Sequence, residues 1–163
     1  MKILKMMILT VGLLGLLLAS AEASTFDEVM AHYEPIRLAL LEDSMEGVNG
    51  HGRAIADELR SLQGDFSPAR AGASVDAAEV VREKLGEMIA AADTLAKAST
   101  LEAARDAFYE LTKPLVRWRQ GVSSDDRPRV AYCSMYKRSW LQPGEEIGNP
   151  YGGMPRCGEI VAK

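Results

Sequence analysis

The last third of the chain holds both of its cysteines, and each cysteine lies close to a methionine. The first cluster is Cys133-Ser134-Met135, and the second is Met154-Pro155-Arg156-Cys157. A thiolate binds a soft metal ion strongly, and a thioether adds a neutral ligand that Mg²⁺ and Ca²⁺ disfavour. This ligand set predicts a site for a thiophilic ion, above all Cu(I), with Ag(I) as the alternative ion. The predicted ligands are Cys133, Met135, Met154 and Cys157.

The spacing within each cluster is compatible with a shared site. Side chains alternate along an extended segment, so Cys133 and Met135 can place both sulfur atoms on one side of it. The three-residue separation of Met154 and Cys157 can place both sulfur atoms on the inside of a turn. Between the clusters, Asn149-Pro150-Tyr151-Gly152-Gly153 is too rich in Pro and Gly for regular structure.

A disulfide is the alternative reading of the two cysteines, because exported proteins often join such a pair. A bridge from Cys133 to Cys157 would close a loop of about 25 residues and contribute roughly 3 kcal/mol. The chain would then be a stapled structural or interaction module without metal. Four sulfur atoms converging on one point favour the metal site, whereas bonded cysteines with both methionines packed elsewhere favour the staple. The two states can also alternate as a redox switch, because oxidation removes both thiolates.

The two histidines are the other candidate ligands. His51 lies between Val48 and Ile55 on the apolar stripe of a predicted helix. This position predicts a core histidine that donates to a backbone carbonyl, with a ligand completing the sulfur site as the alternative. We expect His32 to be a surface residue. No His-x-x-x-His or Glu-x-x-His pair is present, so zinc and di-iron sites built on these patterns find no support.

Catalytic patterns are weak, and we predict that the chain is not an enzyme. It has no Gly-rich nucleotide loop and no Cys-x-x-Cys pair. The adjacent acids Asp125-Asp126 and Glu145-Glu146 lie in polar turns, where a solvated surface is the expected role. We therefore predict that the chain binds a metal ion and does not convert a substrate.

The N-terminus has the pattern of a secretory signal peptide. Lys2 and Lys5 precede an apolar run from Met6 to Leu18, and Ala21-Glu22-Ala23 gives a small-residue cleavage pattern. We therefore expect residues 1–23 to be removed by cleavage after Ala23. The apolar run is short for a membrane span. The prediction is a periplasmic or secreted protein with no membrane span after cleavage.

The charge of the chain excludes some partners. The whole chain carries a formal net charge of −4, and cleavage would remove Lys2, Lys5 and Glu22, which makes the mature chain more acidic. An acidic balance argues against binding to nucleic acid or to an anionic membrane surface. It is compatible with a soluble exported protein that meets cations.

Apolar residues that recur every three or four positions predict four amphipathic helices before residue 122. Pro35 should kink or restart the first helix, residues 63–73 should be a loop, and Ser99 with Glu102 should form a capping box. Short connections between such helices predict an all-α, up-and-down four-helix bundle over residues 24–121. The expected helices are Phe26–Ser44, Met45–Leu62, Ser74–Ala98 and a fourth that opens at Ser99 and ends at Gly121.

Residues 122–163 should form an irregular Cys/Met tail packed on the bundle. Residues 130–132 and 159–161 could be short paired strands that flank the Cys/Met segment. We expect Trp140 and Tyr151 to pin the loop to the bundle rather than to bind a ligand. One domain with a tail is what 163 residues allow.

The tail also resembles a known family. The runs that carry the resemblance are Tyr132-Cys133-Ser134-Met135, Ser139-Trp140-Leu141, Ile147-Gly148-Asn149-Pro150-Tyr151-Gly152 and Met154-Pro155-Arg156-Cys157-Gly158. They are similar to the C-terminal signature of an uncharacterised bacterial domain, found as small exported proteins or fused to periplasmic adaptor subunits of copper/silver RND efflux pumps. In that signature Pro is usual where this chain has Ser134. The resemblance implies periplasmic heavy-metal binding as a chaperone, a buffer or an accessory to efflux, with the efflux adaptor as a partner.

Overall fold

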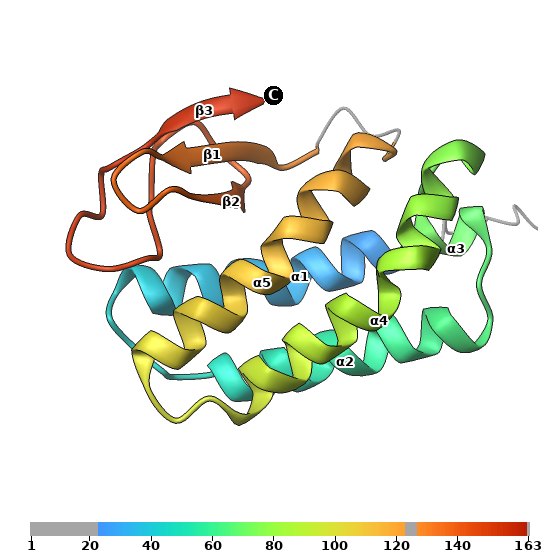
Figure 1. Ribbon diagram of the computed structural model, residues 1–163, viewed down its shortest axis with the longest axis horizontal. Helices are drawn as coiled ribbons and strands as arrows, with labels where there is room; N and C mark the ends of the chain where they lie inside the picture. The colour runs from blue at the N-terminus through green and yellow to red at the C-terminus, as the bar shows by residue number, and fades with distance from the viewer. Residues whose placement is uncertain (1–22, 123–126, 163) are drawn as a thin grey trace, which may run out of the picture.

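The computed structural model describes residues 23–122 and 127–162, which fold into helices followed by a small sheet (Figure 1). The predicted signal peptide up to residue 22 and the acids Asp125-Asp126 lie outside the described residues. The helices are α1 (Thr25–Leu41), α2 (Val48–Gly64), α3 (Pro68–Ala71), α4 (Val75–Lys97) and α5 (Leu101–Gln120). The strands are β1 (Arg129–Cys133), β2 (Arg138–Gln142) and β3 (Glu159–Ala162).

Hydroxyl side chains cap the described helices except α2, whose N-cap is Gly47. Ser24 caps α1, since its Oγ accepts from the backbone N–H of Asp27 and its own N–H donates to the Asp27 carboxylate at 3.1 Å. Ser24 is also the first residue after the predicted cleavage point. Thr100, rather than the predicted Ser99, caps α5 by accepting from Ala103. The predicted cap is therefore displaced by one residue, and the predicted capping box does not form, because N3 is Ala103.

The proline in α1 does not break that helix. The α1 helix runs without interruption through Pro35, although proline removes one helical hydrogen bond. Tyr33, Ile36 and Leu40 are fully buried on both sides of Pro35, and their packing outweighs the lost bond. The predicted loop over residues 63–73 also contains the short helix α3, which begins at Pro68 with Ser67 as its cap.

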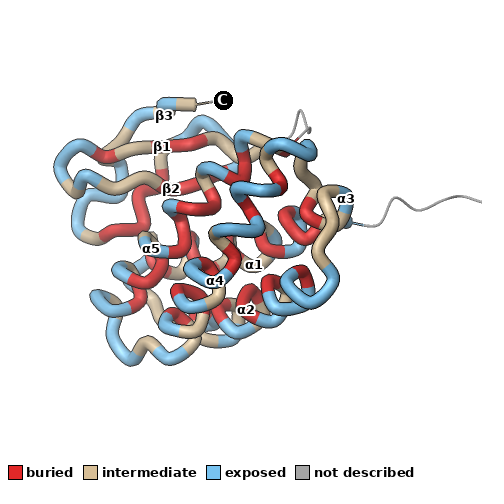
Figure 2. Tube along the Cα trace, turned by 45° about the vertical axis from the view of Figure 1, so that its right-hand side comes forward, coloured by how far each residue is buried: buried red, intermediate tan, exposed pale blue. Residues whose placement is uncertain are grey.

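The four long helices enclose the main core. α1 packs against α2, α2 against α4, α4 against α5, and α5 also contacts α1. Figure 2 shows buried positions recurring along the inner sides of these helices, with exposed positions facing outward. This burial follows the apolar periodicity of the sequence. Among the described residues, no helix is both long and apolar enough to cross a membrane.

The fold is mostly helical but not all-α, so that part of the prediction is wrong. The three strands form one antiparallel sheet in the order β2-β1-β3. The predicted pairing of residues 130–132 with 159–161 is confirmed, since Ala131 pairs with Ile160 and Tyr132 with Glu159. β2 was not predicted, because five residues without polar–apolar alternation give no strand signal. Burial of Trp140 and Leu141, together with contacts between β2 and α5, holds this strand in place.

Candidate metal centre

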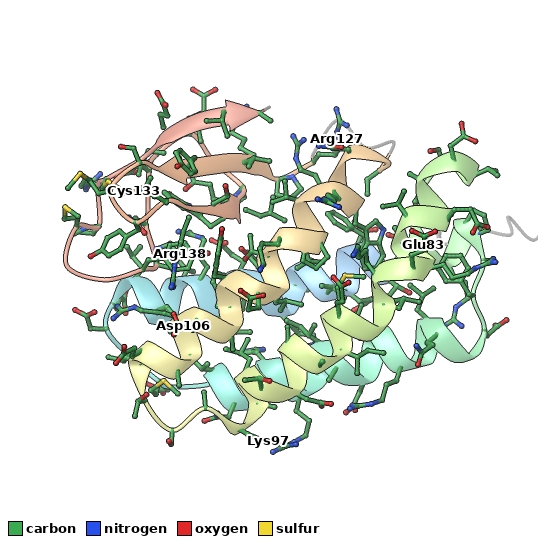
Figure 3. All side chains as sticks on the ribbon, in the orientation of Figure 1. Glu83, Lys97, Asp106, Arg127, Cys133 and Arg138 are labelled. Atoms are coloured by element: carbon green, nitrogen blue, oxygen red, sulfur yellow. A yellow bond between two sulfur atoms is a disulfide. The ribbon has the colours of Figure 1, made fainter. Side chains whose placement is uncertain are left out.

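The structure joins Cys133 and Cys157 in a disulfide. The sulfur–sulfur distance is 2.14 Å and the Cα atoms lie 5.6 Å apart. Cys133 ends β1 and is fully buried, whereas Cys157 lies in the turn before β3 and is partly exposed. Figure 3 shows the sulfur–sulfur bond beside the labelled Cys133, at the end of the sheet. In this state the cysteines carry no thiolate, as the alternative reading of the sequence expects.

The two methionines beside the disulfide are exposed. The exposed fraction is 69% for Met135 and 37% for Met154, whereas Met88 in α4 is fully buried. Met135 lies in the turn that joins β1 to β2, because β1 ends at Cys133. Residues 134–137 form this turn, so the extended segment that could place both sulfur atoms on one side is not present. The expected turn is present at the second cluster, where the N–H of Cys157 donates to the Met154 carbonyl at 3.0 Å.

A buried asparagine organises the loop that carries the second cluster. The backbone N–H of Asn149 donates to the Pro155 carbonyl at 2.9 Å, and its Nδ2 donates to the Cys157 carbonyl at 3.1 Å. Its Oδ1 accepts from the N–H of Tyr151 at 2.9 Å. Because Asn149 is buried, these bonds are shielded from water. One side chain therefore fixes the backbone on both sides of Met154.

Two arginines, one from α1 and one from α5, donate hydrogen bonds to the backbone of the same loop. Arg37 in α1 donates through Nη1 to the Gly148 carbonyl at 2.7 Å and is itself held by the carboxylate of Glu34. Arg105 in α5 donates through Nε to the Pro150 carbonyl at 2.8 Å. Charge-assisted bonds to backbone carbonyls are stronger than neutral ones. The backbone of the Cys/Met loop is thus tied to both α1 and α5.

Tyr151 is an aromatic anchor, as predicted. Its hydroxyl donates to the Ser139 carbonyl at 2.7 Å, and its ring lies 6.2 Å from those of Phe108 and Trp140. Burial raises the pKa of this phenol well above its ordinary value. Arg138 of β2 lies over the Tyr151 ring and pairs with Asp106 of α5 at 2.7 Å, and Figure 3 labels both partners.

Close approaches bring the two turns together. A Cβ atom at Gly152 would lie 3.4 Å from the Tyr136 hydroxyl, which belongs to the turn that contains Met135. Gly158 has a φ of 149°, and a Cβ there would lie 2.5 Å from Cη2 of Trp140. Glycine is the residue that permits this φ. The turn after Cys133 and the loop before Cys157 therefore meet at one end of the sheet.

The histidines behave differently from the sequence predictions. Nδ1 of His32 lies 3.0 Å from Nδ1 of His51, and both side chains are partly buried between α1 and α2. His51 thus pairs with His32 rather than with a backbone carbonyl, and His32 is not simply a surface residue. Among the described residues, no group of three or more His, Cys, Asp and Glu side chains could hold a metal ion. His51 accordingly does not join the two cysteines.

No local sequence pattern indicates this histidine pair, because the partners lie on different helices and are 19 positions apart. The adjacent acids Glu145 and Glu146 agree with their prediction. Glu145 and Glu146 lie on the surface, as expected, and form ion pairs with Arg129 at 3.2 Å and Arg156 at 2.5 Å.

Comparisons with protein-family models, with curated proteins and with solved structures give no match for this chain. The resemblance of the tail to the exported heavy-metal domain therefore stays a prediction that rests on the residues quoted above.

Proposed function

We propose that this chain is an exported soft-metal protein whose reduced tail binds one Cu(I). Cys133 and Cys157 supply thiolates, and Met135 and Met154 supply thioethers. The observation that carries the proposal is the placement of the methionines. Met88 fills the core, whereas the two methionines that flank the cysteines are exposed at 69% and 37%. An exposed thioether contributes little to packing and is accessible to a soft ion.

The disulfide is the oxidised, metal-free form in this proposal. A dithiol reductant gives two electrons and two protons to the Cys133–Cys157 bond and is itself oxidised to a disulfide. Cu(I) then displaces both thiol protons into solvent and binds the two thiolates. Because each thiolate then bonds the ion, at about 2.3 Å, and no longer the other sulfur, the two sulfur atoms must move apart. Cys157, in a turn, can make this movement more readily than Cys133, which is paired within β1.

The ligand set also sets the selectivity of the proposed site. Thioethers add affinity for Cu(I) and Ag(I) but little for Zn²⁺, which the two thiolates alone would hold less selectively. The physiological role in this proposal is that of a periplasmic chaperone or buffer, or an accessory that hands metal to an efflux adaptor. The residues of the tail that resemble the exported heavy-metal domain support this role. The helices, arranged as an up-and-down four-helix bundle, serve as the rigid base of the site.

Titration of the reduced mature protein with Cu(I), against a competing chelator, tests the proposal. The wild type should take up one equivalent. Cys133→Ser and Cys157→Ser should weaken binding far more than Met135→Leu and Met154→Leu, since each serine replaces a soft anion with a hard neutral ligand. Met88→Leu is the matched control, because that thioether is buried in the helices, and it should leave uptake unchanged. Equal weak uptake by all six proteins would refute the site.

A stapled module without metal is the second candidate, and the disulfide itself favours it. Under this reading the bridge only stabilises the tail, and the exposed surface around it contacts a partner. Either Cys→Ser change would then lower the melting temperature of the oxidised protein, and both Met→Leu changes would do little. Reduced wild type would show no stoichiometric uptake of Cu(I), which separates this candidate from the first.

A further inference from the structure

Three arginines gather where the chain passes from α5 to β1. Arg119 in the last turn of α5 is 97% buried, given its exposed fraction of 3%. Its Nε donates to the carbonyl of Pro128, the residue between Arg127 and Arg129. Figure 3 labels Arg127 near the start of β1, and Cys133 lies at the opposite end of that strand. This cluster is therefore separate from the Cys/Met tail.

The described residues provide an ion-pair partner for Arg129 but none for Arg119 or Arg127. Arg129 pairs with Glu145 at 3.2 Å, but no carboxylate of residues 23–122 or 127–162 pairs with Arg119 or Arg127. Nη2 of Arg119 and Nε of Arg129 are buried without a hydrogen-bond partner. Burial is the main cause that lowers the pKa of Arg119, and the positive charges of Arg127 and Arg129 lower it further. A buried guanidinium with an unused donor is costly unless an anion meets it.

We propose that Arg119, Arg127 and Arg129 form a binding site for a phosphate-type oxyanion at the junction of α5 and β1. The planar guanidinium presents donors in a fork that matches two oxygens of such an anion. Arg119 Nη2 and Arg129 Nε supply the buried donors, and the partly exposed Arg127 supplies the outer one. The ligand is inorganic phosphate or the phosphate group of a monoester, since both present the same oxygens.

Calorimetry of the mature protein at constant ionic strength tests the site, with inorganic phosphate and glycerol 3-phosphate as separate ligands and chloride as the background anion. Saturable binding of phosphate at one site per chain is expected. If only inorganic phosphate binds, the ligand of the site is the free ion. If glycerol 3-phosphate binds as well, the site accepts a phosphate group on a larger molecule. Binding of neither overturns the proposal.

Variants locate the binding. Arg127→Gln, at a partly exposed position, should weaken phosphate binding at least tenfold without loss of the fold, and Arg119→Gln should abolish it. Arg156→Gln is the control, because that arginine is exposed and pairs with Glu146; it should bind like the wild type. Asp125 and Asp126 test an internal counter-charge. If these carboxylates occupy the cluster, Asp125→Asn with Asp126→Asn will destabilise the protein and create phosphate binding that the wild type lacks, which contradicts the proposal.

Discussion

The helices and the tail are held together by different forces. The helices bury a continuous apolar core, including Phe26, Ile55, Leu85 and Leu111, and side-chain caps satisfy the first backbone N–H groups of α1 and α4. The strands of the tail add Trp140 and Leu141 to that core, and the loop between β2 and β3 adds Tyr151. The backbone of the loop over residues 143–158 depends in addition on one disulfide, one buried asparagine and two arginines that reach carbonyls from the helices.

This difference sets what each region can do. The hydrophobic effect that holds the helices together has no preferred direction, and their side chains are close-packed. A local movement of one helix would therefore disturb the packing of the others. A loop held by a few directional bonds can change locally when one bond is broken, while the base beneath it stays folded. The tail is thus suited to open on reduction, and the helices are suited to stay unchanged.

Truncation of the core should have the largest effect on stability. Leu85 in α4 is 1% exposed, so Leu85→Ala should lower the free energy of unfolding by about 2–5 kcal/mol through lost burial and a new cavity. Denaturant unfolding should show the helices and the tail lost in one transition. Leu38→Ala, at a 43% exposed position of α1, is the matched control. If the tail stayed folded at denaturant concentrations that unfold the helices, the tail would not depend on the helices as described.

Removal of an arginine anchor should affect the tail more than the helices. Arg37→Met leaves the Gly148 carbonyl and the Glu34 carboxylate without their partner, at a cost of about 2–3 kcal/mol. Amide exchange should rise in residues 143–158 and change little in α2 and α4. Arg156→Met in the same loop should change little, since its side chain is exposed. A uniform rise in exchange across the helices would show that Arg37 supports the core instead.

A methyl group at Gly158 should disturb the closure of the disulfide loop. Gly158→Ala must place Cβ against Trp140 at a φ of 149°, which costs about 2 kcal/mol. Gly153→Ala is the matched control, because nothing lies within 4 Å of a Cβ there. Melting temperatures of the two oxidised variants provide the measurement. Equal values would mean that the turn at residue 158 adapts without strain.

Alkaline pH should weaken the contact between tail and helices gradually. Burial raises the pKa of Tyr33 and Tyr151 above the ordinary value of 10.0. Above about pH 10 the unfolded chain releases phenolic protons that the folded protein keeps. Stability is therefore complete below that pH and falls above it, by up to about 1.4 kcal/mol per pH unit for each tyrosine. Tyr151→Phe should make the decline between pH 10 and 12 shallower, and an unchanged slope would contradict this assignment.

The sequence predicted the region that depends on periodic burial better than the region that depends on directional bonds. The helices and the pairing of residues 130–132 with 159–161 could be read from the pattern of apolar residues. The bonds from Arg37 and Arg105 to distant carbonyls, and the contact between His32 and His51, have no local signal. The sulfur residues could be found by type and spacing, but thiolate ligands and a disulfide use the same two cysteines, so sequence left that choice open.

Hydrogen exchange of the mature protein in three states tests the central claim most directly. The states are oxidised, reduced, and reduced with one equivalent of Cu(I). We predict that reduction increases exchange in β1, β3 and residues 143–158, leaves α2 and α4 unchanged, and is reversed in those same segments by Cu(I). Reduction without any change, or Cu(I) that leaves the reduced tail unprotected, would contradict a tail that exchanges its disulfide for a metal ion on a fixed helical base.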